Sequence, residues 1–579
     1  MSHAHAGNLE QLVFWLSVFW SALYAFRYHR RRARRVSTLP GLTSSARPAS
    51  TELFRSSVTR ITLDKCHLRY QSTAWNALHQ SSSARLAKRT DWRTALQLVY
   101  DVGSLLGVLG MLGSVLLLVW TTLQLASTLY AGSTHVGSHV SAGGIRKRDF
   151  NDYGDDAIHE ADVAPPLQLI VPGLTTPLHH LPLLLVALLA TQVIHECGHA
   201  VAAALDSLPL TSAGLGFTII LPSAFVAFPT EETESLPPRS RVRLISAGAF
   251  HNIMFWLALG ALAWLRSSDL VWPALGYRNV SRYGRVVVAV DEASPLSGYL
   301  PVGAVIYKVG DETLASQQGA AKRWEALMSA SGDTSTSSLG WCADESWFTA
   351  QDSSCCATQS SGVASSSCFV TTGETQNERC VNPLRFLQSL ETQSVRRCAF
   401  APECGHDQTC IRPRADQELL SLTMHMPPWW TTEGGSSERT VVWQGDRAQI
   451  LEEVEIGDWL PRYSWLPIGL PYVWGTLFSY LKVLTLSLYF FNLLPLPFLD
   501  GGQLLDALYD WWPAGKSQGF EGVDLDRLEE GRERSAAVSP ERPAGTRTGR
   551  KAGWRRVVHI TVGTLTGCCI VLSIVDTYH

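Results

Sequence analysis

A histidine, a glutamate and a second histidine stand close together in His195-Glu196-Cys197-Gly198-His199. If this segment is helical, the two histidines lie about 40° apart around the axis, so both imidazoles can reach one metal ion. Glu196 then lies about 100° from the first histidine and about 60° from the second, near enough to hold a water molecule. This spacing is typical of a zinc site in which a carboxylate serves as general base.

The motif lies inside an apolar run, Leu181–Leu205, which is long enough to cross a membrane. The alternative to a metal site is an accidental match or a pair of core histidines held by hydrogen bonds. Ionisable side chains at membrane depth are costly and usually functional, which favours the metal site. Cys197 would point about 160° away from His199, so we expect it to be an ordinary small helix residue.

The composition indicates a membrane protein. Only 17% of the 579 residues are charged, against about a quarter in soluble domains, and 46% are hydrophobic. No basic stripe with interleaved aromatic residues is present, so nothing indicates direct nucleic-acid binding. We expect a predominantly α-helical polytopic protein of the lipid bilayer with about six spans, at Leu12–Phe26, Val102–Tyr130, Leu181–Leu205, Leu244–Leu265, Leu481–Phe498 and Val557–Val575.

Basic residues indicate the orientation of these spans. Six spans place four basic clusters on one side, which the positive-inside rule makes cytosolic: Arg27–Arg35, Arg85–Arg93, Arg239–Arg243 and Arg550–Arg556. Both termini and the loop 266–465 then lie on the luminal side. We interpret the first span as a retained anchor and not a signal peptide, because its positive charges follow the apolar run.

Eight of the 12 cysteines lie between Cys342 and Cys410, inside the loop 266–465. An even number of cysteines in a luminal loop is typical of disulfides formed in an oxidising compartment. The alternative is a second zinc site, built from Cys398, Cys404, His406 and Cys410. The sequon at Asn279 falls in the same loop and would be accessible to glycosylation.

Polar and apolar blocks divide the chain into seven segments. We expect an anchor with a basic cytosolic segment, a second span with a luminal loop, a core with the histidine motif, a luminal α/β domain with a Cys-rich insertion, a second core segment, a disordered cytosolic loop and a C-terminal span. Their bounds are 1–97, 98–180, 181–265, 266–465, 466–512, 513–553 and 554–579. Residues 214–228 are apolar and β-rich, and they predict a hairpin that dips toward the histidine motif, with a surface strand pair as the alternative.

A catalytic zinc site needs a third protein ligand and an open position for water. Asp500 ends an apolar segment, where a buried carboxylate would otherwise have no explanation. Pro495 and Pro497 break the helix before it and free backbone groups that could line a polar cavity. The expected topology places Asp500 and the two histidines near the cytosolic ends of their spans, so their depths match.

These two motifs together, His195-Glu-Cys-Gly-His199 and Asn492-Leu-Leu-Pro-Leu-Pro-Phe-Leu-Asp500-Gly, resemble those of the site-2 protease family of intramembrane zinc metalloproteases. The resemblance implies that His195, His199 and Asp500 bind one catalytic Zn²⁺. It also implies that Glu196 is the catalytic acid and base.

The same resemblance implies the substrates. They would be membrane-anchored precursors, often of transcription factors, already trimmed on the luminal side, and cleavage would release a cytosolic fragment. Asn492, Pro495 and Asn252 match positions expected to bind the substrate, with a helix-packing amide as the alternative for Asn252. Residues 284–313 are similar to a PDZ-like module, and the Cys-rich insertion resembles the eukaryotic, Golgi-type branch, so we expect a location in the Golgi or endoplasmic reticulum.

Two other functions are compatible with the spans. A catalytically inactive zinc-binding scaffold or receptor would keep the fold, but it would have no need of Glu196 as a general base. A metal transporter would carry ionisable residues along several spans, whereas here they gather at one site. We therefore expect a zinc metalloendopeptidase.

Overall fold

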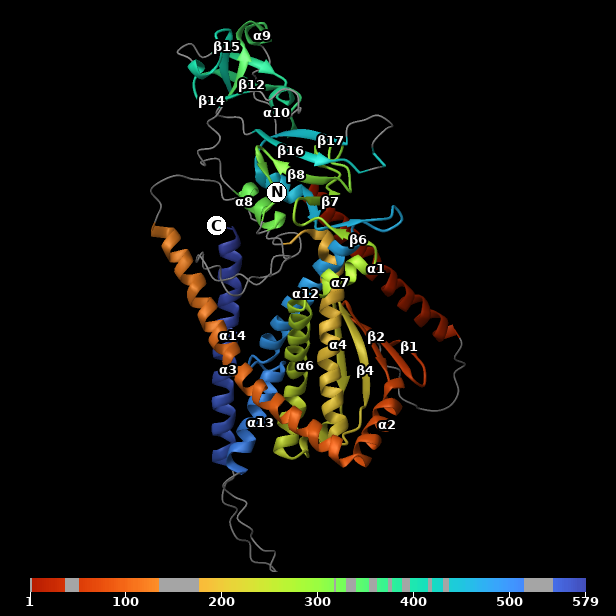
Figure 1. Cartoon of the computed structure of the whole chain (residues 1–579). Coiled ribbons are helices and arrows are strands. Elements are labelled where there is room, and N and C mark those ends of the chain that lie inside the picture. Colours follow the sequence, from red (N-terminus) through yellow and green to blue (C-terminus); the bar gives the residue numbers. More distant parts are fainter. Residues whose placement is uncertain are drawn as a thin grey trace, which may run out of the picture. The chain divides into compact units, whose positions relative to one another are not determined.

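The computed structural model describes residues 3–36, 52–134, 176–316, 319–329, 340–353, 362–372, 377–387, 396–414, 419–427, 429–430, 437–514 and 545–578. The chain divides into two compact units (Figure 1). The first unit contains Met1–Leu262 and Leu477–His579, and the second contains Ala263–Thr476.

Five of the described helices are long and apolar enough to cross a membrane: α3 (Thr90–Thr134), α4 (Leu181–Leu205), α6 (Pro238–Trp264), α12 (Leu470–Asn492) and α14 (Gly545–Tyr578). Five of the six expected spans fall on these helices. The fifth expected span, Leu481–Phe498, is shifted: its helix starts at Leu470 and ends at Asn492, ahead of the proline-containing loop.

The first expected span is not confirmed within the described residues. Leu12–Phe26 lies in α1 (His3–Val36), which is not among the helices apolar enough to cross a membrane. The physical reason is length, because this apolar stretch has roughly 15 residues and a span needs about 20. Shorter helices of the first unit are α2 (Ala74–Lys88), η1 (Leu178–His180), α5 (Thr230–Glu234) and α13 (Asp500–Ala514).

One antiparallel five-stranded sheet belongs to the first unit, in the order β1-β2-β3-β4-β5. Its strands are β1 (Glu52–Arg55), β2 (Thr59–Asp64), β3 (His67–Ser72), β4 (Ser212–Thr218) and β5 (Leu221–Ala227). β4 and β5 form the hairpin expected within residues 214–228 and start two residues earlier. The hairpin does not stand alone, because β3 pairs with β4 along its whole length. Residues from the segment 27–97, for which the sequence indicates no fold, thus complete the sheet.

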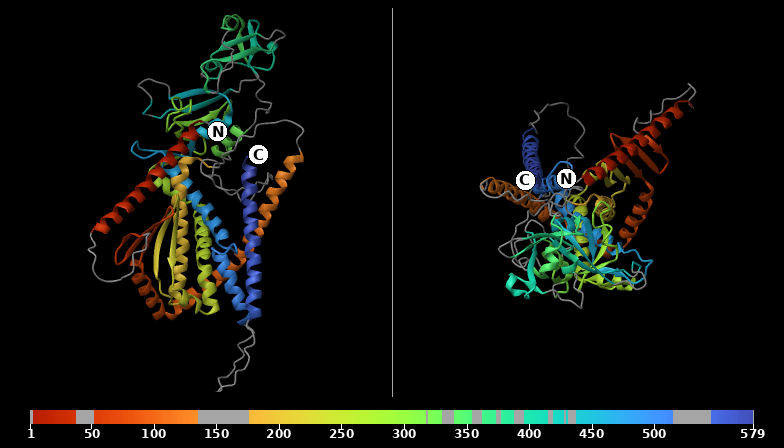
Figure 2. Two further views of the ribbon diagram at one scale, coloured as in Figure 1. Left: turned by 180° about the vertical axis from the view of Figure 1, so that it is seen from behind. Right: turned by 90° about the horizontal axis from the view of Figure 1, so that it is seen from above.

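The helix α1 packs on this sheet (Figure 2). The side chain of Trp20 is 7% exposed, and its Nε1–H donates to the carbonyl of Ile219 at 3.0 Å. Two arginines of the same helix donate to strand carbonyls: Arg27 to Leu63 at 2.7 Å and Arg30 to Leu53 at 2.9 Å. An aromatic anchor and charge-assisted hydrogen bonds therefore hold α1 against the sheet.

Close packing and one buried cation join the apolar helices. A Cβ added to Gly107 of α3 would lie 2.7 Å from the Cβ of Ser246 on α6, so glycine is needed for this approach. Arg243 of α6, 6% exposed, forms ion pairs with Asp101 of α3 at 2.8 Å and with Asp206, which follows α4, at 3.1 Å. This triad connects the N-terminal parts of α3 and α6 with the C-terminal end of α4.

The second unit is built on strands. A seven-stranded sheet has the order β11-β17-β16-β8-β7-β18, with β9 on β8; a five-stranded sheet has the order β13-β12-β15-β10-β14; and β19 pairs with β6. Trp324, Trp443, Ile306 and Leu422 lie at the centre of the main core and are at most 1% exposed. Strands β7, β8, β17, β18 and β19 lie within the α/β domain expected at 266–465, whereas the likeness to a PDZ module stays a prediction.

The elements of this unit have the following bounds. The strands are β6 (Tyr277–Asn279), β7 (Arg285–Val290), β8 (Val305–Val309), β9 (Glu312–Thr313), β10 (Gly340–Asp344), β11 (Gly362–Val363), β12 (Ser367–Thr371), β13 (Glu378–Val381), β14 (Arg397–Cys398), β15 (Gln408–Pro413), β16 (Leu419–His425), β17 (Glu438–Gln444), β18 (Val454–Gly457) and β19 (Trp459–Pro461). The helices are α7 (Ser267–Ala274), α8 (Ala320–Ser329), α9 (Glu345–Thr349), α10 (Leu384–Leu387), η3 (Ala401–Glu403) and α11 (Arg447–Glu453).

Disulfides are confirmed in the Cys-rich segment. Cys342 pairs with Cys404, and Cys398 pairs with Cys410. Cys368 and Cys380 are also disulfide-bonded, while Cys355 and Cys356 lie outside the described residues. The alternative of a second zinc site is wrong, because three of its four candidate ligands are consumed in disulfides and have no thiolate to offer. The described free cysteines, Cys66, Cys197, Cys568 and Cys569, all lie in the first unit.

Candidate metal centre

The two histidines of α4 point at the same place. α4 runs without interruption from Leu181 to Leu205, with a proline in its first turn, where the missing N–H costs nothing. His195 and His199 therefore project from one face one turn apart, and their Nε2 atoms lie 3.1 Å apart. His195 is 6% exposed.

Asp500, the first residue of α13, completes the group. Its Oδ2 lies 2.9 Å from Nε2 of His195 and 3.4 Å from Nε2 of His199. Ligand atoms around a tetrahedral ion with bonds of about 2.0–2.1 Å would be about 3.3 Å apart, so these separations fit one small ion. The donor set of two imidazoles and one carboxylate is also one that Zn²⁺ accepts.

The Asp500 carboxylate has no other use in the described structure. Despite the short distances, its buried Oδ2 accepts no hydrogen bond of acceptable geometry from the described residues. A charged, unsatisfied and buried oxygen between two imidazole nitrogens is the environment that a cation would complete.

Gly248 of α6 keeps the space in front of the histidines open. A Cβ at this position would lie 2.5 Å from Nε2 of His195 and 2.4 Å from Nε2 of His199. No real Cβ approaches other atoms so closely, and it would occupy the side of both imidazoles from which a metal is bound. The close approach of α6 to α4 thus depends on glycine here.

The outer nitrogens of both imidazoles have protein partners. Nδ1 of His199 lies 2.9 Å from the carbonyl of Leu244, so Nδ1–H donates and Nε2 keeps its lone pair. Nδ1 of His195 lies 3.2 Å from the side-chain amide nitrogen of Asn252, whose Oδ1 is buried and unpaired within the described structure. Turning this carboxamide by 180° lets Oδ1 accept from Nδ1–H of His195, which satisfies the orphan oxygen and again directs the Nε2 lone pair to the centre.

The substrate-binding role expected for Asn252 stays a prediction. Asn252 is 0% exposed and its side chain contacts Nδ1 of His195, which favours the alternative of a packing amide. His251, its neighbour, lies 2.6 Å from the hydroxyl of Tyr100 and outside the group of three candidate ligands. A sequence pattern could place Asn252 on the α6 face that includes Gly248, but it could not reveal which side chain α6 meets.

Glu196 faces the sheet. Its Oε2 accepts the backbone N–H of Val226 on β5 at 2.9 Å. One turn earlier on α4, Oε1 of Gln192 accepts the backbone N–H of Ala224 at 2.9 Å. Gln192 is absent from the sequence-based candidates, although its spacing of four residues from Glu196 on a helix was the available signal.

The loop between α12 and α13 carries the second motif. Asn492 ends α12 and is half-buried, and Pro495 is buried. A Cβ at Gly501 would lie 2.1 Å from the carbonyl oxygen of Leu493, and one at Gly502 would lie equally close to that of Leu496, so both glycines are needed for the loop to fold back onto α13. This fold-back positions Asp500.

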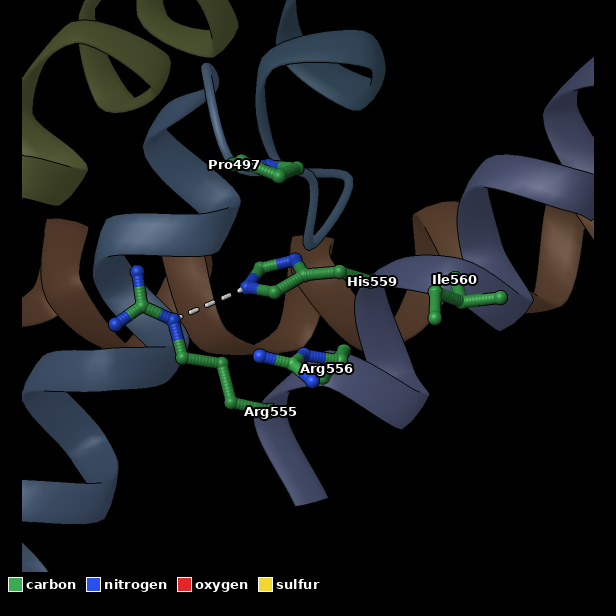
Figure 3. Close-up of a pocket in the computed structure, with 5 residues that line it drawn as sticks. All are labelled: Pro497, Arg555, Arg556, His559 and Ile560. Carbon is green, nitrogen blue, oxygen red and sulfur yellow. Dashed lines mark hydrogen bonds between the residues drawn. The ribbon is translucent and has the colours of Figure 1, made fainter. Parts of the chain in front are cut away.

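Helix α14 clamps this loop (Figure 3). Nδ1 of His559 lies 2.8 Å from the carbonyl oxygen of Pro495, and Nε of Arg555 donates to Nε2 of His559 at 3.4 Å. Arg555 also pairs with Asp506 of α13 at 3.1 Å. Because Nε2 accepts, Nδ1–H is the donor to Pro495, and α14 thereby ties the loop and α13 together. His559 had no signal in the sequence, since its partner is 64 residues away.

Comparison with known proteins gives a consistent answer. The model of peptidase family M50 matches residues 183–444 and 464–521, more than half of the chain. A membrane-bound transcription factor site-2 protease homolog of Arabidopsis thaliana is 32% identical over 135 residues, which are 23% of this chain and 25% of the relative. The chain thus matches about a quarter of that relative's length. The matched regions include the helix with the histidines and the loop with Asp500, and the chain belongs to the site-2 proteases of peptidase family M50, a family of membrane metalloproteases.

Proposed function

We propose that this protein is an intramembrane zinc metalloendopeptidase. One observation carries the proposal: Nε2 of His195, Nε2 of His199 and Oδ2 of Asp500 lie within 3.4 Å of one another, beside Glu196 and among apolar helices. A Zn²⁺ ion held by these three atoms would polarise the scissile carbonyl and make water a nucleophile at neutral pH.

Glu196 supplies the proton transfers of this reaction. Its carboxylate takes a proton from the attacking water and returns it to the amide nitrogen of the leaving peptide, so that the C–N bond breaks with a neutral amine. Neighbouring groups hold the histidines: the backbone carbonyl of Leu244 and the side chain of Asn252 fix the outer nitrogens, so neither imidazole can rotate away from the centre. Asn492, the last residue of α12, and Pro495, in the loop before Asp500, are the proposed substrate contacts.

A transmembrane substrate reaches this centre only after its helix unwinds, because helical carbonyls are already hydrogen-bonded. The sheet offers a partner for the unwound segment, since β5 is its last strand and lies beside α4. Pairing with an edge strand compensates the backbone groups that unwinding exposes, which matters most where water is scarce.

The substrates that we propose are membrane-anchored precursors, with transcription-factor precursors first, because the matched relative is named for that class. Cleavage near the cytosolic ends of the spans would release a cytosolic fragment after a first luminal cut, in the Golgi or endoplasmic reticulum. The disulfide-rich segment favours a luminal position for the second unit. The competing function is a zinc-binding scaffold of the same fold without turnover.

Metal removal separates the two functions. Purified protein in detergent is incubated with a luminally trimmed, membrane-anchored reporter before and after chelation, and again after addition of Zn²⁺. A protease loses cleavage on chelation and regains it with about one equivalent of zinc per chain. If the protein binds one zinc ion per chain but cleaves no such reporter, the scaffold function is correct and the protease function is wrong.

A further inference from the structure

The strand β5 has one free edge, and that edge faces α4. In the pairing of β4 with β5, Gly214 is opposite Phe225 and Ala213 is opposite Val226. The N–H groups of Ala224 and Val226 are directed away from β4, because both donate to side chains of α4. Among the described strands, β4 is the sole neighbour of β5 in this sheet.

Two side-chain oxygens occupy the place of a sixth strand. Residues i and i+2 of a strand are about 6.8 Å apart, and residues i and i+4 of a helix are about 6 Å apart along its axis. Gln192 and Glu196 therefore match the spacing of Ala224 and Val226, and each accepts one N–H at 2.9 Å. They satisfy the same donors that the carbonyl groups of an added strand would satisfy.

One of these two oxygens belongs to the proposed general base. An extended segment that pairs with β5 must accept the N–H of Val226, and this displaces Oε2 of Glu196 from it. In the structure, then, the carboxylate that must take a proton from water is engaged by the strand that would receive the substrate.

We propose that Gln192 and Glu196 close the edge of β5 at rest, and that an extended substrate segment opens it and thereby frees Glu196. This inference rests on the proposed protease function. Gln192 is then a positioning residue, which competes with the substrate for the N–H groups of β5. Glu196 becomes free to act as the base only when the substrate pairs with β5. If a peptide bond reaches the centre without pairing with β5, the carboxylate of Glu196 is still hydrogen-bonded to Val226.

The structure of β5 does not depend on its hydrogen bonds to Gln192 and Glu196. Phe225 and Ser223 face β4 through the other set of backbone groups, and Arg69 of β3 lies over the ring of Phe225, 4.0 Å from its centroid. Removing either hydrogen bond leaves these contacts in place. Residues 222–227 are half-buried, so an N–H released from Gln192 can still meet solvent or substrate.

Two substitutions, made singly and together, test the proposal, with KM for the membrane-anchored reporter as the readout. Gln192→Leu keeps the side-chain size but removes the acceptor, so KM should fall about threefold to tenfold, the value of one hydrogen bond. Gln192→Glu keeps an acceptor oxygen and should not show this fall. Ala224→Pro removes the N–H for which Gln192 and the substrate compete while sparing the β4 ladder, so Gln192→Leu added to Ala224→Pro should no longer lower KM. Ala224→Ser is its matched control, because it retains the N–H.

The outcomes decide between the proposal and its alternatives. If Gln192→Leu leaves KM unchanged or raises it while the wild type cleaves, Gln192 only attaches the sheet to α4 and this inference is wrong, but the protease function stands. If the wild type does not cleave, both are wrong. Should Ala224→Pro lose its zinc through misfolding, Gln192→Leu decides alone, because partial unfolding cannot lower KM.

Discussion

At the scale of the residue, the site depends on three atoms that converge and on the groups that aim them. Nε2 of each histidine is available because its Nδ1 has a fixed partner, the carbonyl of Leu244 or the side chain of Asn252. Oδ2 of Asp500 is available because no described group donates to it. The centre is therefore organised for a cation before one arrives, which lowers the cost of binding it.

Gly248 gives the sharpest test of this geometry. Gly248→Ala places a methyl group against both Nε2 atoms, so zinc content should fall from about one per chain to near zero. Gly260→Ala on the same helix is the matched control, because a Cβ there has no described atom within 4 Å. Zinc is measured by mass spectrometry on both purified variants. Full zinc in the Gly248 variant would mean that the metal is bound elsewhere.

Asn252 should control metal affinity more than substrate affinity. Asn252→Leu removes the partner of His195, and loss of such a partner typically weakens metal binding about 10-fold to 100-fold. Asn252→Asp keeps an acceptor for Nδ1–H and should retain most of the affinity. Competition with a chelator of known affinity measures both variants. Wild-type zinc affinity combined with a raised KM would return Asn252 to the substrate-binding role that its sequence position suggests.

The two motifs could be found from the sequence because their chemistry is local. His195, Glu196 and His199 follow helical spacing, and Asp500 is a lone carboxylate at the end of an apolar run. Gly248 and the true partner of Asn252 could not be found, since each is defined by an element that packs across from it. Helical spacing places Gln192 on the same face as Glu196, but it does not show that Gln192 meets β5. Which side chains meet depends on the crossing of α4 with α6 and β5, and that crossing leaves no periodic signal.

At the scale of the element, the Arg243 triad shows how the ends of three helices are held. Arg243→Met leaves the carboxylate of Asp206, whose side chain is 9% exposed, buried without its cation. Removal of one partner from such a pair costs about 3–5 kcal/mol. Arg241→Met is the matched control, because Arg241 makes an exposed pair with Asp510 at 3.5 Å, worth about 0–1 kcal/mol. Thermal unfolding in detergent should separate the two variants clearly, and equal Tm values would show that the triad does not hold the helices.

The five-stranded sheet of the first unit was only partly predictable from the sequence. The hairpin of β4 and β5 could be predicted because its two strands are neighbours in the chain. In β2 (Thr59–Asp64), polar and apolar residues alternate only weakly, and polar residues are frequent. The sheet continues from β3 to β4, which begins about 140 residues after β3 ends. Short strands of mixed polarity become stable only through such long-range pairing, so residues 52–72 showed no fold by themselves.

At the scale of the whole molecule, the number of spans sets the topology. Five candidate spans, with α1 packed on the sheet, still leave all four basic clusters on one side of the membrane. A five-span topology predicts an N-terminus on the cytosolic side, whereas the expected six spans predict a luminal one. The luminal position expected for the disulfide-rich unit stays a prediction, and the described free cysteines all belong to the other unit.

This topology predicts two outcomes in sealed microsomes. An N-terminal tag should be digested by externally added protease, and Asn279, between α6 and α12, should carry a glycan removable by a glycosidase. The mutant Asn279→Gln provides the control for glycan attachment. A protected tag would restore the first expected span at Leu12–Phe26, and an unglycosylated Asn279 would question the luminal position of its unit.

The central claim is that His195, His199 and Asp500 hold a catalytic zinc ion for which Glu196 moves the protons. The most direct test compares wild type with Glu196→Gln, measuring cleavage of a luminally trimmed membrane-anchored reporter and zinc content on the same preparations. Glutamine keeps the size of the side chain and an acceptor for Val226 but cannot take a proton, so we expect zinc to be retained and cleavage to fall at least a hundredfold. Equal cleavage by the two proteins, or a folded wild type that binds no zinc, would contradict the account.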